Sequence, residues 1–279
     1  MKKVIVLLLA AVLLLSVIGC KKAENKKLTV AMSPDFAPME FVDTSKSGQE
    51  QYVGFDVTLA NFLAKELGME LEIKPMSFDA CMTAVQLGSV DMAISGFSWK
   101  PDRAENFLLS DYYIAGDNET QQSVITVKAK ENTCKTQADF SGWKVGAQAS
   151  SLQEQLVKDE LIPAGAELVV YKSIDDAVLA LQTGKIDALA VAHGNGEAII
   201  ANNPDLAFTG FDFDVDPKYE NNVILLNKSN TEMLEKVNQV LAKAMAAGVY
   251  DGWYEDAKAL AGIPTAADVS YDDDGKPVS

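Results

Sequence analysis

SFDACMTAVQLGSVDMA, residues 77–93, is matched 96 residues later by SIDDAVLALQTGKIDAL, residues 173–189. Each stretch has the apolar spacing of an amphipathic helix, which ends at a glycine and leads into a short apolar strand. The identical pairs are Ser77 and Ser173, Asp79 and Asp175, Ala84 and Ala180, Gln86 and Gln182, Gly88 and Gly184, and Asp91 and Asp187. A repeated helix–glycine–strand unit predicts two α/β lobes of similar build, although two ordinary amphipathic helices could also match by chance.

The strand of the first copy leads into Ser95, Gly96 and Ser98, and a proline turn then carries the chain to Arg103. Ligands of open α/β sheets bind just beyond the carboxyl ends of the strands, where hydroxyls and backbone N–H groups are accessible. The planar guanidinium of arginine matches a carboxylate in two-point contact. These residues predict a carboxylate-binding corner, although Arg103 could instead pair with a neighbouring acidic residue on a solvated loop.

Two other loops at predicted strand ends carry candidate ligand contacts. Phe36 follows the first strand in a turn-rich loop, where it could plug the core or form an aromatic wall. Gln148, Ser150 and Ser151 stand where another strand runs into a helix, and a helix N-terminus suits an anionic group. Capping alone would account for Ser151, because Glu154 follows it at capping-box spacing.

The single histidine, His193, also follows an apolar strand. A lone histidine is most often an ordinary hydrogen-bonded residue, and a ligand contact is the alternative. Cys81 and Cys134 fall in a predicted helix and a predicted loop of different lobes, so a disulfide between them is not favoured. With one histidine and no Cys-x-x-Cys motif, the sequence predicts neither a metal site nor a cofactor.

Residues 1–19 have the form of a secretory signal peptide, with two lysines before an apolar run. The run ends before Cys20 in a sequence that resembles a bacterial lipobox, in which cleavage precedes a lipidated cysteine. A transmembrane anchor is the alternative, but it needs roughly 20 apolar residues and the run is shorter. We therefore expect residues 20–27 to form a lipidated tether and the protein to be anchored to the cell membrane, outside the cytoplasm.

The formal net charge of −16 argues against nucleic acid as a partner. The roughly 250 residues beyond the tether suit one large or two medium domains. We expect residues 28–118 and 220–262 to form the first lobe and residues 119–219 the second. Residues 263–279 form a polar tail, which is expected to be disordered from Pro264 onward.

Together these features resemble the family 3 extracellular solute-binding proteins, the receptor subunits of polar amino acid ABC importers. The resemblance covers residues 28–261, and its most specific motifs are FAP at 36–38, GFDV at 54–57, QLGSVD at 86–91, SWKPDR at 98–103, FLLSDYY at 107–113 and LQTGKIDA at 181–188. It implies an α/β, two-lobed, periplasmic-binding-protein-like (type II) clamshell. In that fold each lobe is a mostly parallel sheet flanked by helices.

The resemblance also implies roles for the candidate residues. Phe36 and Phe78 would sandwich the side chain of the ligand. The α-carboxylate would be held by Ser95, Gly96, Ser98 and Arg103, with help from Ser151.

One position departs from the family pattern. An aspartate that commonly holds the α-ammonium of the ligand is replaced here by Ala192. A methyl group cannot satisfy an ammonium, and a buried unpaired charge is costly. Either a group near His193 or Asn195 replaces the aspartate, or the ligand has no α-ammonium.

The expected function is capture of an amino acid, or a related small carboxylate, by a monomer that closes at hinges near 114–122 and 217–222. The protein would then deliver the ligand to the permease of an ABC importer, without catalysis. A secreted enzyme on the same scaffold, such as a cyclohexadienyl dehydratase, is one alternative, but no paired acid and base is evident in the cleft loops. A sensory lipoprotein without a transport role is the other.

Overall fold

The computed structural model describes residues 26–113, 121–219, 221–265, 270–271 and 277–278. The predicted signal peptide and the lipidation site at Cys20 lie outside the described residues. Within the described ranges, no helix is both long and apolar enough to cross a membrane.

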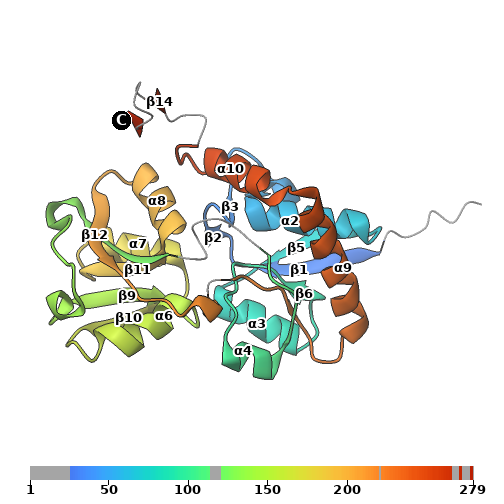
Figure 1. Ribbon diagram of the computed structural model, residues 1–279, viewed down its shortest axis with the longest axis horizontal. Helices are drawn as coiled ribbons and strands as arrows, with labels where there is room; N and C mark the ends of the chain where they lie inside the picture. Colours follow the sequence, from blue (N-terminus) through green and yellow to red (C-terminus); the bar gives the residue numbers. More distant parts are fainter. Residues whose placement is uncertain (1–25, 114–120, 220, 266–269, 272–276, 279) are drawn as a thin grey trace, which may run out of the picture.

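Two five-stranded sheets with the same plan form the two lobes (Figure 1). In each sheet three strands run parallel, a fourth is antiparallel to them, and a fifth is antiparallel to the fourth. The order in the first lobe is β5 (Glu70–Pro75), β1 (Lys27–Met32), β6 (Met92–Ala93), β13 (Leu225–Leu226) and β7 (Leu108–Leu109). The order in the second lobe is β10 (Glu167–Tyr171), β9 (Lys144–Gln148), β11 (Ala188–Ala192), β8 (Gln122–Val127) and β12 (Leu206–Asp212). The prediction of a two-lobed α/β fold with mostly parallel sheets is confirmed.

Helices cover both faces of each sheet (Figure 1). The first lobe carries α2 (Phe55–Glu66), α3 (Phe78–Gln86), α4 (Pro101–Asn106), α9 (Thr231–Ala247) and α10 (Tyr250–Leu260). The second carries α6 (Leu152–Leu156), α7 (Ile174–Gln182) and α8 (His193–Asn202). A small antiparallel sheet joins β2 (Asp35–Phe36), β3 (Glu40–Val42) and β4 (Tyr52–Val53). The remaining short helical segments are η1 (Gly48–Gln51), η2 (Lys128–Lys130), η3 (Gln137–Phe140), η5 (Pro217–Tyr219) and a π-helical turn, η4 (Val157–Leu161).

The repeated sequence forms α3 and β6 in one lobe and α7 and β11 in the other. Its aspartates have the same structural role in both copies. The Asp91 carboxylate accepts hydrogen bonds from the backbone N–H of Thr29 at 2.7 Å and from its hydroxyl at 2.6 Å. The Asp187 carboxylate accepts from the backbone N–H of Lys144 at 3.0 Å and from the Lys130 ammonium at 3.0 Å. Thr29 lies in β1 and Lys144 in β9, which occupy the same place in the two sheets, so the repeat ties each helix–strand turn to the neighbouring parallel strand.

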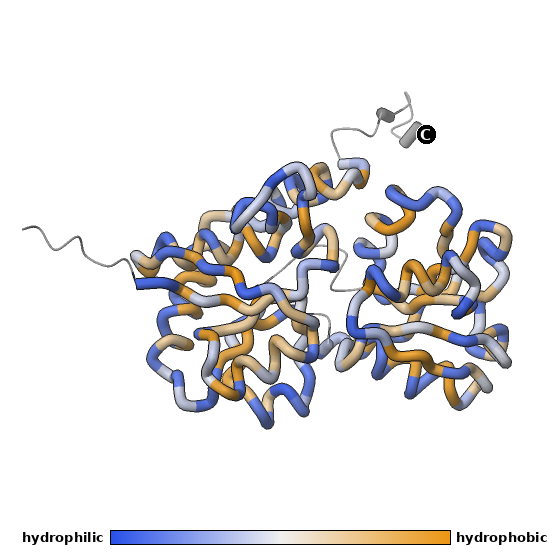
Figure 2. The backbone as a smooth tube through the Cα atoms, turned by 180° about the vertical axis from the view of Figure 1, so that it is seen from behind, coloured by the Kyte–Doolittle hydropathy of each residue, from blue (hydrophilic) through white to orange (hydrophobic). Residues whose placement is uncertain are grey.

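Each lobe has its own apolar core on the two faces of its sheet. Figure 2 shows hydrophobic stretches recurring within both lobes. The inward face of α2 is buried in the first lobe, with Phe55, Leu59 and Leu63 fully enclosed. Cys81 and Cys134 are buried free thiols, one in each lobe.

The chain crosses between the lobes twice. The first crossover runs through 114–120, outside the described residues, and the second includes η5. The two meet where the backbone N–H of Tyr113 donates to the carbonyl of Asn222 at 3.1 Å. The predicted hinges at 114–122 and 217–222 are therefore described only in part.

The chain beyond α10 contacts the second lobe. Ile263 is buried and packs with Ala198 of α8, so it is not part of a free tail. Within the stretch expected to be disordered, β14 (Ser270–Tyr271) pairs with β15 (Pro277–Val278).

Candidate functional site

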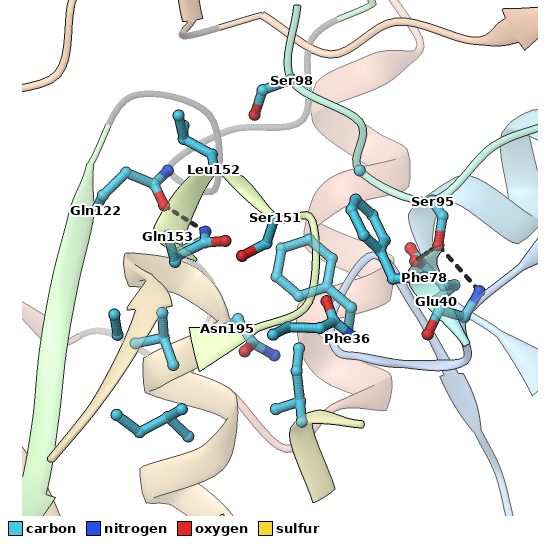
Figure 3. A pocket seen from close by; sticks show the side chains of 18 of the residues that line it. Phe36, Glu40, Phe78, Ser95, Ser98, Gln122, Ser151, Leu152, Gln153 and Asn195 are labelled. Atoms are coloured by element: carbon cyan, nitrogen blue, oxygen red, sulfur yellow. Dashed lines mark hydrogen bonds between the residues drawn. The ribbon is translucent and has the colours of Figure 1, made fainter. Parts of the chain in front are cut away.

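A pocket lies between the two lobes, at the carboxyl ends of β1, β6, β9 and β11 (Figure 3). Eight of the residues predicted from the sequence line it: Phe36, Phe78, Ser95, Gly96, Ser98, Arg103, Gln148 and Ser151. Figure 3 shows the rings of Phe36 and Phe78 together in the pocket, with Ser151 and Asn195 across from them. The structure thus brings together candidates that lie up to 115 residues apart in the sequence.

Arg103 is a buried cation without a carboxylate partner among the described residues. It is the third residue of α4, and only 1% of its surface is exposed. One terminal nitrogen donates to the carbonyl of Ser98 at 2.5 Å, and the other donates across the lobes to the carbonyl of Ser150 at 3.0 Å. Its Nε has no hydrogen-bond partner in the part of the chain that the structure describes.

The surroundings of the guanidinium are mostly apolar. Its central carbon lies 5.5 Å from the ring centre of Phe78 and 5.3 Å from that of Phe97. Desolvation by burial lowers the pKa of Arg103 to about 10, still well above neutral pH. Asp102 is exposed and faces Lys100 at 3.9 Å, so it does not neutralise the guanidinium by direct contact. The solvated loop that was the alternative for Arg103 is not what the structure shows.

Ser95 and Gly96 are held by two buried carboxyl groups, Glu40 and Asp56. The Ser95 hydroxyl accepts from the backbone N–H of Ser33 at 3.0 Å and donates to Glu40. The Gly96 N–H donates to Asp56 Oδ2 at 2.7 Å. In this arrangement both hydrogens are used within the first lobe, so the two residues shape the corner rather than offer their hydrogens to a ligand.

Glycine is required at position 96 for two reasons. Its φ of +54° is a left-handed conformation that side chains rarely adopt. A Cβ there would also lie 2.6 Å from Cε1 of Phe36. The absence of a side chain therefore lets the aromatic ring lie directly against the backbone of the corner.

Glu40 and Asp56 are functional residues that the sequence motifs did not indicate. Both are fully buried, and Asp56 also accepts from the Tyr113 hydroxyl at 3.1 Å. The sequence does contain a sign that these acids are buried, because each stands between apolar neighbours, in MEF at 39–41 and FDV at 55–57. A charged residue inside an apolar stretch is buried only where it is paired or hydrogen-bonded.

The two carboxyl groups cannot both be ionised at low cost. Burial, and next the charge of Asp56, raise the pKa of Glu40 well above its ordinary range. Burial raises the pKa of Asp56 to about 7, against hydrogen bonds from Gly96 and Tyr113 that lower it. Glu40 Oε2 and Asp56 Oδ1 have no hydrogen-bond partner among the described residues, so no donor at these oxygens offsets the cost of a second negative charge.

This pair gives the protein a specific pH dependence. Because the pKa of Asp56 is raised from 3.8 to about 7, its contribution to stability is present at acidic pH and is lost as the pH rises through that window. The free energy of unfolding of the wild type, relative to that of Asp56→Asn, is expected to fall with a slope on the order of 1 kcal/mol per pH unit. Urea unfolding at a series of pH values measures this difference.

The control for that titration is Asp43→Asn. Hydrogen bonds from Ser45 and Lys46 lower the pKa of this half-buried aspartate to about 2, so its titration ends below the window. The Asp43→Asn variant should leave the slope of the free energy of unfolding against pH equal to that of the wild type. Parallel pH profiles for the wild type and Asp56→Asn would contradict the raised pKa of Asp56.

The second lobe presents Ser151, whose hydroxyl accepts from the backbone N–H of Glu154 at 3.0 Å and caps α6. The cap uses only the oxygen of that hydroxyl, so Ser151 can still donate its hydrogen to a group in the pocket. Ser150 has a φ of +64° and contributes its carbonyl to Arg103, but its side chain does not line the pocket. The structure therefore shows the capping role predicted for Ser151. The helix that it caps, α6, is five residues long.

His193 lies outside the pocket lining. Its ring stacks on Phe208 with the centres 4.5 Å apart, and its Nδ1 hydrogen bonds with the Ser123 hydroxyl at 2.8 Å. That hydroxyl donates to Asp212 at 2.5 Å. The structure therefore places His193 as an ordinary hydrogen-bonded residue of the second lobe, and Asn195 lines the pocket instead.

The lobes contact one another around the pocket. Asp35 of the first lobe accepts from the backbone N–H of Ile174, the first residue of α7, at 2.8 Å. The Asn195 amide donates to the carbonyl of Ala37 at 2.8 Å. Phe36 packs against the apolar cores of both lobes. The pocket is therefore enclosed by contacts from both sides.

Comparison with known proteins agrees with this architecture. The arginine-binding extracellular protein ArtP of Bacillus subtilis is 29% identical over 247 residues, covering 86% of this chain and 92% of ArtP. ABC transporter arginine-binding protein 1 of Escherichia coli is 28% identical, covering 89% of this chain and 98% of that protein. These relatives are named as binding proteins rather than enzymes.

Solved structures show the same fold. The amino acid ABC transporter substrate-binding protein AbpA of Streptococcus pneumoniae, bound to L-arginine, superposes with a TM-score of 0.77 at 34% identity, over 86% of this chain and 97% of that one. An ancestral arginine-binding protein bound to glutamine gives a TM-score of 0.73 at 32% identity, over 83% and 97%. Residues 28–256 match the sequence model of the bacterial extracellular solute-binding proteins, family 3. The chain belongs to this family.

Proposed function

We propose that the protein captures an amino acid or a related small carboxylate between its lobes and delivers it to the permease of an ABC importer. The observation that carries the proposal is the buried guanidinium of Arg103, which has an unpartnered Nε in a pocket shared by both lobes. A buried charge without a partner is costly, and a ligand carboxylate would supply the missing negative charge.

The proposed binding mode follows from the elements that bring the residues together. Arg103 and Ser98 hold the carboxylate from the first lobe, and Ser151 donates to it from the second. Phe36 and Phe78 pack against the rest of the ligand. Because the ligand would contact both lobes at once, its binding stabilises the closed arrangement, and that arrangement is the form the importer would recognise.

The location in the cell completes the proposal. The sequence of residues 1–20 supports secretion followed by lipidation of Cys20. The protein would then act as a monomer on a short tether outside the cytoplasm, next to its permease. The relatives named above are binding proteins of ABC transporters or extracellular binding proteins, which supports this placement.

Isothermal titration calorimetry tests the proposal. The mature protein is unfolded in guanidinium chloride, washed free of retained ligand and refolded, and circular dichroism verifies the fold. It is then titrated with the twenty amino acids and with small carboxylic acids that lack an amino group. We expect saturable binding of at least one of these compounds with one site per chain. Folded protein that binds none of them would rule the proposal out.

A further inference from the structure

We infer that the ligand of this pocket is a carboxylic acid without a positively charged group, such as a 2-oxo, 2-hydroxy or unsubstituted acid with an apolar side chain. This inference rests on the proposed function, because it takes Arg103 to be the partner of the ligand carboxylate. It goes further by naming the class of acid.

The charges that line the pocket carry the argument. Among the described lining residues, Arg103 and Glu40 are the ionisable side chains, and the others are apolar, hydroxyl, amide or glycine residues. Glu40 is engaged by the Ser95 hydroxyl and shares its surroundings with Asp56. Burial, and next the charge of Asp56, raise the pKa of Glu40 well above its ordinary range, which disfavours its charged form. The pocket thus presents one guanidinium and one carboxyl group, and burial beside Asp56 disfavours the charged form of that carboxyl group, the form that would pair with an ammonium.

The nearest other acid is already committed. Asp35 does not line this pocket, and its two oxygens accept from the backbone N–H of Ile174 at 2.8 Å and from the Ser33 hydroxyl at 2.9 Å. The first bond joins the two lobes, and the second holds the loop after β1 within the first lobe. Turning this carboxylate toward a ligand would break the contact with α7.

The wall that β11 of the second lobe forms is apolar, so it offers no partner to a ligand ammonium. Leu189, Ala190, Val191 and Ala192 of β11 all line the pocket, and each is at least nine-tenths buried. Ala192 is also the N-cap residue of α8, where no side chain caps the first turn. An ammonium placed there would meet methyl groups and the positive end of the helix.

The net charge of the complex then distinguishes the ligand classes. A monocarboxylate brings one negative charge and neutralises Arg103. A zwitterionic amino acid brings an additional ammonium that has no carboxylate to face, and arginine brings two cationic groups. Because a buried unpaired cation is costly, each added cation weakens binding.

Matched ligand sets test the inference on the unmodified protein. Each set keeps one side chain and changes only the group next to the carboxylate: phenylalanine, phenylpyruvate and 3-phenylpropanoate; leucine, 4-methyl-2-oxopentanoate and 4-methylpentanoate; and arginine with its 2-oxo analogue. We expect that in the set that binds best an acid without the amino group has a dissociation constant at least about tenfold lower than the amino acid.

The outcomes separate the inference from the proposed function. An amino acid that binds more tightly than its deaminated partners overturns the inference and leaves the proposed function standing. Folded protein that binds no member of any set, and no other carboxylate, overturns both.

A pair of variants provides an independent test. Ala192→Asp adds a carboxylate at the start of α8, and Ala192→Asn adds a side chain of the same size that can also cap the helix but has no charge. We expect Ala192→Asp to shift the ratio of the two dissociation constants toward the amino acid by about tenfold, while Ala192→Asn leaves it near that of the wild type. Equal ratios in both variants would contradict the inference, and the wild-type ligand sets remain decisive if either variant fails to fold.

Discussion

Replacing Arg103 with methionine is expected to weaken ligand binding strongly without destabilising the protein. Methionine fills a similar volume between the rings of Phe78 and Phe97 and removes the charge. Truncating one partner of a buried, hydrogen-bonded charge pair typically costs several kcal/mol, so the affinity should fall roughly a hundredfold or more. The free protein loses a buried cation that has no carboxylate partner among its described residues, so its free energy of unfolding should stay constant or rise.

Two measurements on the same samples separate binding from folding. Calorimetry gives the affinity, and urea unfolding gives the stability. Lys100→Met is the matched control, because it removes a cation from the same loop at a residue that does not line the pocket. Arg103→Lys keeps the charge but loses the planar fork, and it should bind more weakly than the wild type. A clear loss of stability in Arg103→Met, with affinity retained, would show that the guanidinium serves the fold and not the ligand.

The duplicated architecture could be predicted from the sequence because its signal is local. A helix, a glycine and a strand lie within 17 consecutive residues in each copy, and the glycines adopt φ values of +67° and +71° that favour glycine. Arg103 could be predicted for the same reason. It lies ten residues after the end of β6, so its position relative to the sheet depends on one short turn and the start of α4.

The partners of the site could not be predicted in the same way. The sequence suggests that Ser95 and Gly96 are free donors. In the structure Ser95 donates to Glu40, 55 residues earlier, and Gly96 donates to Asp56, 40 residues earlier. His193 reads as a site residue because it follows a strand end, yet Phe208, Ser123 and Asp212 hold its ring away from the pocket. In both cases the outcome depends on packing between distant segments, which a local pattern does not contain.

Asp35 illustrates the same limit between lobes. It stands in the turn-rich loop beside Phe36, and nothing in the loop sequence indicates a partner. The structure pairs it with the backbone N–H of Ile174, 139 residues away. Predicting this contact requires the placement of one lobe against the other, which follows from the hinges and not from either lobe alone.

Replacing Asp35 with alanine is therefore expected to weaken ligand binding by favouring the open arrangement of the lobes. The substitution leaves the buried N–H of Ile174 without its acceptor at closure, and a lost hydrogen bond to a charged group costs about 1.5–3 kcal/mol. Since Asp35 does not line the ligand pocket, this cost acts on closure and lowers the affinity by roughly ten- to a hundredfold.

Small-angle X-ray scattering distinguishes this effect from a lost ligand contact. With saturating ligand the Asp35→Ala variant should have the same radius of gyration as the wild type, because the closed complex is unchanged. Without ligand its radius should be larger. Asp176→Ala removes an exposed carboxylate from the first turn of the same helix and should change neither quantity. Wild-type affinity in Asp35→Ala, together with unchanged scattering, would mean that the contact between Asp35 and α7 does not control closure, and the affinity would then depend on the pocket alone.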